Sequence, residues 1–417
     1  MKIFKSAEIR RKIFFTLLIV VVFRLLAHVP TPGVDVSSIK EFLQSSALLG
    51  MFNLFSGGGF QNFSIVTLGL GPYINVSIII QLLTVMIPSL EELSKEGEIG
   101  RERINSYTKL FSIPMAFLQS FGIYFLLTRQ GIISHLLPFD LLVLIFSLTA
   151  GSMILIWIGD LVTEYGVGNG ISLLIFIGII SSLPSYLVSL ITNIDQSNII
   201  LYSIYTIIAI LVICGIVLIN EGTRNINIEY GRIGTTSQKV VNYLPLKINQ
   251  AGVIPIIFAV SIIMLPSIIS APLIQSKNFY LEWFGKVLAQ NFSTLSLVYN
   301  ITFFLLVLGF TYFYTYVQFN PQKIADDIKK RGGFIPGIRP GANTTKYLSS
   351  VVSKTTFAGG VFLGLIAILP YLLYLILGSS MMSIGGTSLL IVVSVVLETI
   401  RQIKSMFVNK NYDNYLN

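Results

Sequence analysis

The sequence predicts an all-α membrane protein that crosses the bilayer ten times. Of its 417 residues, 53% are hydrophobic and only 11% are charged, whereas about a quarter of an ordinary soluble domain is charged. Apolar residues form long blocks, including 65–87, 199–219 and 253–274, which reach the roughly 20 residues that a spanning helix needs. Because these blocks are continuous rather than alternating, they favour helices over the strands of a transmembrane barrel.

The ten spans follow in order along the chain. They are expected at residues 12–29, 64–88, 109–129, 138–162, 169–190, 198–220, 249–274, 296–319, 357–378 and 383–407. We expect the first span to be retained, because it continues into HVPTPGVD without the small-residue pattern of a cleavage site. An even number of spans puts both termini on one side of the membrane.

The positions of the basic residues give the side, because Lys and Arg collect in cytoplasmic loops. With both termini inside, the outer side holds only Lys40, Arg129, Lys277 and Lys286, and Arg24 falls within the first span. All other basic residues of the 28 lie in inner segments. The asymmetry predicts that both termini are cytoplasmic.

An inner loop at 221–248 separates residues 1–220 from residues 249–417, and the sixth span, near 198, begins the second half. This division permits two inverted structural repeats. The loop and a second one at 320–356 are longer and more basic than topology requires. Two explanations of this charge are equally good. It either reflects topology alone, or it serves to dock a cytoplasmic partner with an acidic surface, such as ribosomal RNA or a motor protein.

The spans offer little chemistry. The only histidines are His28 and His135, and no HExxH, CxxC or GxxxxGK[ST] pattern occurs, so we expect no enzyme, no metal site and no cofactor. Only Arg24 lies well inside a span. This argues against an ion-coupled transporter, which keeps ionisable residues at mid-membrane. The chain is therefore expected to be a passive conduit, or a scaffold without a through pore, with energy supplied by a partner.

A glycine triplet, Gly57 to Gly59, lies within residues 53–64. Glycine marks turns and mobile backbone, so one interpretation is a flexible outer loop. The other is a short re-entrant piece that occupies a cavity between spans. The pattern alone favours the loop.

Five long motifs carry more information than composition. They are TLGLGPYINVSIIIQLL (67–83), EYGVGNGISLLIF (164–176), LPLKINQAGVIPIIFA (244–259), FNPQKIADDIKKRGGFIPGIRPGANTTKYL (319–348) and GGTSLLIVVSVVLE (385–398), preceded by Phe23, Arg24 and PTPG at 30–33. In order and position they resemble the SecY family of protein-translocating channels. The resemblance implies two pseudo-symmetric halves around an hourglass pore in the cytoplasmic membrane. Such a pore passes unfolded preproteins and releases apolar segments sideways into lipid.

By motif position, the resemblance implies an apolar constriction. Its residues are Leu70, Ile74, Ile171, Ile175, Ile257 and Ile391, here called the ring residues. The first two and the next two are each spaced i, i+4, so each pair shares one helix face. A ring of such side chains makes a dry gasket against ions. Without the resemblance, these residues are ordinary apolar packing.

The resemblance also implies a plug at Asn53–Phe63, which reverses the interpretation of the glycine triplet. Its residues are Asn53, Phe55, Gly57, Gly58, Gly59 and Phe63. A lateral gate is implied between the second and seventh spans, around Gln81 and Asn249, where polar side chains hydrogen-bond across helices. Asn75 and Val76 depart from the small residues that are usual beside the pore.

Partner docking is implied for the two basic inner loops. The residues are Arg339, Lys329, Lys330, Arg331, Arg224 and Arg232. For Lys329–Arg331, topology explains the charge equally well. The implied partners are SecE-like and SecG-like small subunits, a SecA-type ATPase, the ribosome, signal peptides and nascent chains. The loop after the sixth span is less basic than is usual in the family, which predicts weaker contacts there.

Overall fold

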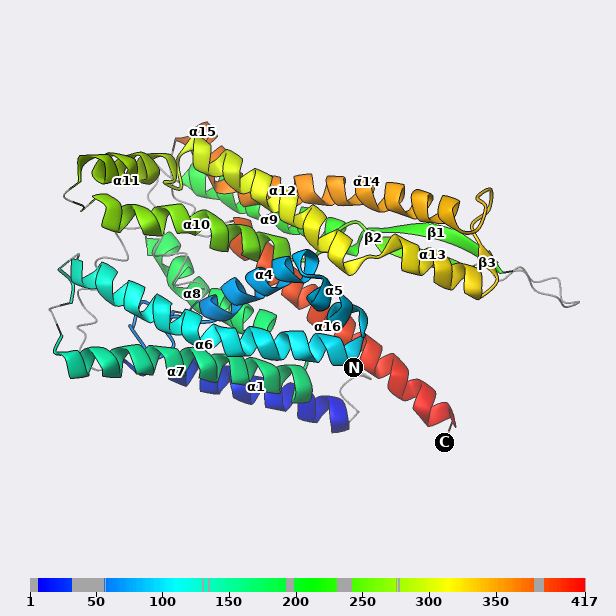
Figure 1. The fold of residues 1–417 in the computed structure, drawn as a ribbon, viewed down its shortest axis with the longest axis horizontal. Helices are drawn as coiled ribbons and strands as arrows, with labels where there is room; N and C mark the ends of the chain where they lie inside the picture. The colour runs from blue at the N-terminus through cyan, green and yellow to red at the C-terminus, as the bar shows by residue number, and fades with distance from the viewer. Residues whose placement is uncertain are drawn as a thin grey trace, which may run out of the picture. The chain divides into compact units, whose positions relative to one another are not determined.

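A computed structural model describes residues 7–31, 56, 58–129, 131–133, 136–192, 199–230, 242–274, 276, 278–378 and 386–416. Helices dominate these residues (Figure 1). The elements in chain order are α1 (Ala7–Leu26), α4 (Gly71–Met86), α5 (Pro88–Lys95), α6 (Glu98–Arg129), α7 (Pro138–Tyr165), α8 (Gly170–Thr192), α9 (Ile199–Glu221), β1 (Thr223–Tyr230), β2 (Asn242–Lys247), α10 (Ile254–Ile274), α11 (Phe279–Asn291), α12 (Leu297–Gln318), α13 (Pro321–Lys330), β3 (Gly333–Phe334), α14 (Ala342–Ala367), α15 (Leu369–Leu377) and α16 (Gly386–Leu416).

A helix lies at each of the ten predicted spans. Within the described residues, six helices are long and apolar enough to cross a membrane, and a seventh span follows if α4 and α5, bent by 100°, count as one. Pro88 explains this bend, because its ring removes a backbone donor at the start of α5. The stretches Gly170–Pro184 and Ile254–Ser267 are apolar but shorter. The class of a helical, multi-span membrane protein is confirmed, and the count of ten stays a prediction.

Two predicted spans contain turns or a break instead of one continuous helix. The second is predicted from residue 64, but α4 begins only at Gly71, because the residues before it form turns in which Gly58 and Gly69 have φ values of 83° and 56°. The ninth is predicted as one helix. Instead, α14 ends at Ala367, and Pro370 in the first turn of α15 prevents a continuous helix.

A three-stranded antiparallel sheet, in the order β2-β1-β3, is an addition to the predicted helices. It joins the two long loops that were predicted to be cytoplasmic, since β1 and β2 come from one and β3 from the other. Ile226 and Ile228 alternate along β1 and are buried. Side chains from both loops and from α14 form one core with Ile226. This core consists of Ile226, Leu246, Ala325, Ile335, Leu348 and Val352.

The chain forms two compact units that interleave along the sequence. Unit 1 comprises Met1–Ile199, Met264–Ser296 and Val395–Asn417, and unit 2 comprises Ile200–Ile263 and Leu297–Ser394. In unit 1, α6 packs against α4 and α7, and α7 also contacts α1 and α8 (Figure 1). In unit 2, α12 and α13 pack along α14. This grouping by contact is a different division from the predicted halves, which stay a prediction.

Candidate functional site

Two of the ring residues lie at the start of α4. Leu70 immediately precedes the helix and Ile74 lies in its first turn, and both are buried. The Ile74 N–H donates to the Leu70 carbonyl (3.0 Å), so the two side chains share one face. The buried Ser152 hydroxyl of α7 donates to the Gly69 carbonyl (2.6 Å). Leu70 therefore follows directly on a backbone group that α7 binds.

Glycines on α7 and at the start of α8 bring backbone segments together. A β-carbon at Gly151 would collide with the Ile65 carbonyl, in the turns before α4. A β-carbon at Gly170, the first residue of α8, would collide with the Gly159 carbonyl of α7. Only glycine permits such contacts. The second contact places α8, which carries two more ring residues: Ile171, half-buried, and Ile175, buried. Thus α7 positions both ring segments of unit 1.

Polar side chains of α6 also hold α4 and α7. Asn105 and Lys109 are spaced i, i+4 and share a face of α6. The Tyr73 hydroxyl of α4 donates to the Asn105 Oδ1 (3.0 Å). Lys109 Nζ pairs with the Asp160 carboxylate of α7 at 2.7 Å. Tyr73 directly precedes Ile74, so one of these contacts is made within the ring segment itself.

The end of the predicted plug is bonded to the chain that follows α1. The Phe63 carbonyl accepts hydrogen bonds from the Thr31 N–H (2.9 Å) and from the Thr31 hydroxyl (2.7 Å). The Ile65 N–H donates to the Val29 carbonyl (3.0 Å). Phe63 has a φ of 42°, which is unfavourable for a bulky residue and persists only where surrounding contacts hold it. Phe63 is therefore an anchored end of this segment.

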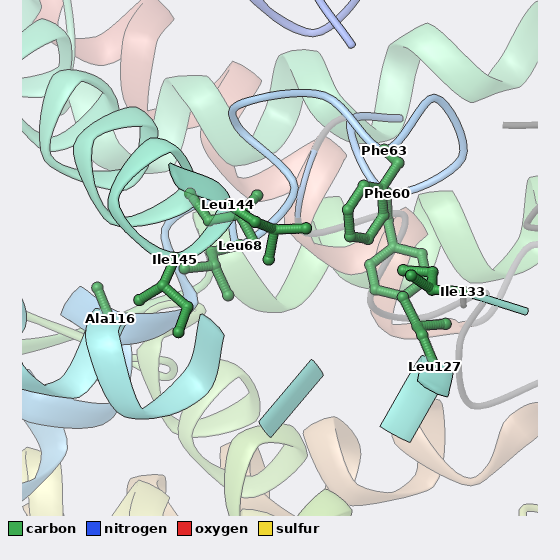
Figure 2. Close-up of a cluster of buried hydrophobic side chains, with 9 residues drawn as sticks. Phe60, Phe63, Leu68, Ala116, Leu127, Ile133, Leu144 and Ile145 are labelled. Carbon is green, nitrogen blue, oxygen red and sulfur yellow. The ribbon is translucent and has the colours of Figure 1, made fainter. Parts of the chain in front are cut away.

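Apolar packing reinforces this anchor. Figure 2 shows Phe60 and Phe63 beside Leu127 and Ile133, within one buried cluster. The cluster consists of Phe60, Phe63, Leu68, Ala116, Leu127, Ile133, Leu144, Ile145 and Leu148. It draws on α6 and α7 as well as on the plug segment. The other plug residues Asn53, Phe55 and Gly57 lie outside the described residues.

Gly58 and Gly59 are tightly placed, and each has a distinct reason to be glycine. Gly58 has a positive φ (83°), and the position of its missing β-carbon lies 3.8 Å from Nη1 of Arg24. A β-carbon at Gly59 would lie 3.0 Å from the Ser56 carbonyl. The one ionisable residue predicted well inside a span thus lies against the plug segment, a proximity that the sequence did not signal.

The remaining ring residues belong to unit 2. Ile257 lies in the first turn of α10 and Ile391 in the second turn of α16, and both are buried. Burial agrees with an apolar role for each of them, and equally with ordinary packing. Because the six ring residues are divided between the two units, their union in one ring stays a prediction.

The two predicted gate residues have different surroundings. The Gln81 amide nitrogen of α4 donates to the Ser77 hydroxyl (3.3 Å), and the buried Gln81 Oε1 has no partner among the described residues. The Asn249 amide makes three hydrogen bonds within unit 2, to Asn220 and to the backbone of Gly252. Gln81 lies in unit 1, so a gate between these two residues also stays a prediction.

The described docking residues lie on one small subdomain of unit 2, which joins the sheet to α13 and the start of α14. Arg224 lies on β1, Lys329 and Lys330 end α13, Arg331 caps it, and Arg339 lies in the turn before α14; all five are exposed. Arg232 lies outside the described residues. The two basic loops thus form one subdomain with a shared sheet and core. The alternation in TRNINIEY (223–230) was the signal for a strand that could have predicted this.

Among the described residues, no three His, Cys, Asp or Glu side chains gather into a group that would hold an ion. The described residues provide buried apolar side chains, a packed segment around Phe60 and Phe63, and exposed basic side chains on one subdomain.

Comparisons with known proteins agree with this arrangement. The family model described as SecY matches residues 64–400. The protein translocase subunit SecY of Corynebacterium glutamicum is 40% identical over 439 aligned residues, which cover 99% of this chain and 98% of the relative. A solved protein-conducting channel is similar in fold, with a TM-score of 0.65, 21% identity, and coverage of 96% of this chain and 93% of that one. Sec61 in the canine ribosome-channel complex has a TM-score of 0.59, 20% identity and the same coverages. Since the family model and the relative each match most of its length, the chain belongs to the SecY family.

Proposed function

We propose that this chain is a protein-conducting channel that passes unfolded preproteins across the cytoplasmic membrane and inserts membrane proteins into it. The observation that carries the proposal is the match, over 99% of the chain, to a protein translocase subunit. In this role the chain is a passive pore and not an enzyme. A partner motor or the ribosome supplies the energy.

The seal of this channel is the apolar ring together with the plug. Leu70, Ile74, Ile175, Ile257 and Ile391 are all buried, as gasket residues of a closed channel would be. Apolar side chains disfavour water in a narrow constriction, and ions then lack the hydration they need to pass. When a translocating polypeptide displaces these side chains, they would pack around it and keep the constriction closed to ions. The plug segment adds a second barrier.

The orientation follows from the positive-inside rule, with both termini and the basic subdomain on the cytoplasmic side. Reporter fusions after residues 40 and 280 should then lie outside, and fusions after residues 230 and 340 inside. A single fusion on the wrong side would break the ten-span assignment.

The basic subdomain is the proposed docking surface for the ribosome and a SecA-type ATPase. Arg224, Lys329, Lys330 and Arg339 are exposed cations on one subdomain, suited to acidic protein or RNA surfaces. A channel of similar fold is known in a ribosome-channel complex. SecE-like and SecG-like subunits would complete the assembly, and signal peptides would open the gate near Gln81 and Asn249.

The decisive experiment measures ion conductance across planar bilayers that contain the purified complex. Ile257→Gly combined with Ile391→Gly should raise the resting conductance, because the apolar barrier is lost. The matched control is Ile207→Gly combined with Ile210→Gly, two isoleucines of α9 that are exposed on the protein surface. The control should stay as tight as the parent.

Removing part of the plug tests the second barrier. Deletion of residues 53–59 together with the two ring substitutions should leak more than either change alone, and the effects need not add because they share one pore. If the combined variant is as tight as the parent, the ring residues are ordinary packing and the pore assignment fails.

A further inference from the structure

A buried chain of polar side chains connects three segments of unit 2. The Asn249 amide nitrogen, in the turn before α10, donates to the Asn220 Oδ1 at the end of α9 (2.9 Å). The Asn220 amide nitrogen donates in turn to the Ser394 hydroxyl of α16 (2.7 Å). The three residues are 4%, 9% and 9% exposed. Hydrogen bonds at such low exposure are strengthened by the low local dielectric.

The Asn249 side chain makes three hydrogen bonds in this network. Besides the bond to Asn220, its amide nitrogen donates to the Gly252 carbonyl (3.1 Å), and its Oδ1 accepts from the Gly252 N–H (3.1 Å). Both donors and one acceptor position are therefore occupied. Asn249 closes the turn that leads into α10, in which Gly252 adopts a φ of 65°.

The backbone before Asn249 is fixed as well. The Ile248 N–H donates to the Gly222 carbonyl (3.0 Å), where β1 begins. The β-carbon position of Gly359, on α14, lies 2.9 Å from the Ile248 carbonyl, so the two backbones are in close contact. The link from β2 to α10 is therefore held by α9, by α14 and, through Asn220, by α16.

The two ends of this row of polar side chains lie near the ring residues of unit 2 in the sequence. Ser394 follows Ile391 by three positions on α16 and lies on the same side of the helix. Ile257 lies one turn into α10, immediately after the turn that Asn249 closes. Polar groups buried this deeply carry a desolvation cost unless they are hydrogen-bonded. The three side chains therefore favour the arrangement in which their mutual bonds are made.

We propose that Asn220, Asn249 and Ser394 are positioning residues that hold the start of α10 and the N-terminal part of α16 in one arrangement, so that Ile257 and Ile391 keep the channel sealed. This inference rests on the proposed function. It assigns Asn249 to the interior of unit 2 instead of to contacts across the gate.

The test is the resting conductance of the purified complex in planar bilayers. Asn220→Leu removes both bonds of the central residue and should raise the conductance about fivefold, and Ser394→Ala removes one bond and should raise it about twofold. The double variant should leak no more than Asn220→Leu alone, because both changes break the same chain. Independent effects would multiply instead, and that result would overturn the proposal.

Two further variants separate positioning from general destabilisation. Ser394→Thr keeps the hydroxyl and should restore the tightness that Ser394→Ala loses. Thr311→Val removes a buried hydroxyl that bonds only to the Val307 carbonyl of its own helix (2.7 Å). It should lower the unfolding midpoint without raising the conductance. If Asn220→Leu does not fold, the comparison of Ala with Thr at position 394 decides.

Failure of the positioning role can be distinguished from failure of the proposed channel function. If Ile257→Gly with Ile391→Gly leaks while Asn220→Leu and Ser394→Ala stay tight, the channel stands and the positioning role is wrong. If the ring substitutions themselves do not leak, the channel proposal fails and this inference fails with it.

Discussion

Both units bring backbone segments together through glycine, and unit 2 adds a buried chain of three polar side chains beside its ring residues. In unit 1, the segments that carry the ring residues lie against α7 through glycine: Gly151 meets the Ile65 carbonyl, and Gly170 meets the Gly159 carbonyl. In unit 2, Gly359 meets the Ile248 carbonyl and Gly386 meets the Ile366 carbonyl in the same way. Buried polar side chains add a further connection there, and Asn220 is its centre. A substitution at a glycine that touches backbone puts a side chain where there is no room for one. A substitution in the row of polar side chains removes only the hydrogen bonds of that one residue.

The difference teaches where the fold tolerates change. A β-carbon at a glycine contact pushes on backbone, which cannot rotate away as a side chain does. A missing hydrogen bond leaves the helices in place and costs the free energy of the unpaired groups. The glycine contacts of unit 1 are therefore expected to fail completely or not at all when changed, and the polar chain of unit 2 to respond by degrees.

The largest effect should come from Gly151→Leu in unit 1. The new side chain collides with the Ile65 carbonyl, and overpacking against backbone should cost about 3 kcal/mol or more of unfolding free energy. Little folded protein should be recovered in detergent, as measured by size-exclusion chromatography. The matched control is Gly122→Leu on α6, where a β-carbon meets open space. Equal recovery of the two variants would break the comparison at its strongest point.

Apolar runs predicted the helices well, because lipid requires each span to bond its own backbone. Glycine contacts such as Gly151 with Ile65 were beyond prediction, because they depend on which helix face meets a segment far away in sequence. The burial of Phe63 was missed for the same reason. Its role in the plug was inferred from a motif, and nothing in the motif says that its carbonyl bonds to Thr31.

The sheet is a different case, since its signal was present. Ile226 and Ile228 alternate with asparagines, and Leu244 and Leu246 alternate in β2, as half-buried strands do. Two separate loops were predicted because only their charge was considered, and the alternation of apolar and polar residues in them was not. The pairing of Asn249 with Asn220 is harder to foresee, because an asparagine in a span serves a gate or an internal bond equally well.

An intermediate effect is expected for Asn249→Ala in unit 2. The change removes the three hydrogen bonds of the Asn249 side chain to Asn220 and Gly252, and a typical intramolecular hydrogen bond contributes about 0.5–1.5 kcal/mol net. We expect a folded protein whose unfolding free energy, measured in mixed micelles, is lower by about 2 kcal/mol. Ser261→Ala on α10 is the control, because its hydroxyl bonds only within its own helix. A loss for Asn249→Ala as severe as for Gly151→Leu would remove the graded response assigned to unit 2.

The smallest effect should come from the ion pair between Lys109 of α6 and Asp160 of α7 in unit 1. Both side chains are about one-third exposed (34% and 33%), and a pair of this exposure is worth about 0.2–1 kcal/mol. The measurement is a double-mutant cycle with Lys109→Met and Asp160→Leu, because only the coupling energy isolates the pair from the packing of each side chain.

The same cycle on the exposed Lys95–Glu91 pair of α5 supplies the lower reference, since those side chains are 64% and 49% exposed. Lys109 and Asp160 should couple slightly more than that pair, because partial burial weakens the screening by water and salt. They should couple less than Asn220 and Asn249, whose bond is buried and whose groups have no water to replace a lost partner. If the ion pair instead couples more strongly than the two asparagines, then α6 and α7 are held by polar side chains as unit 2 is, and the contrast between steric and polar positioning does not divide the two units.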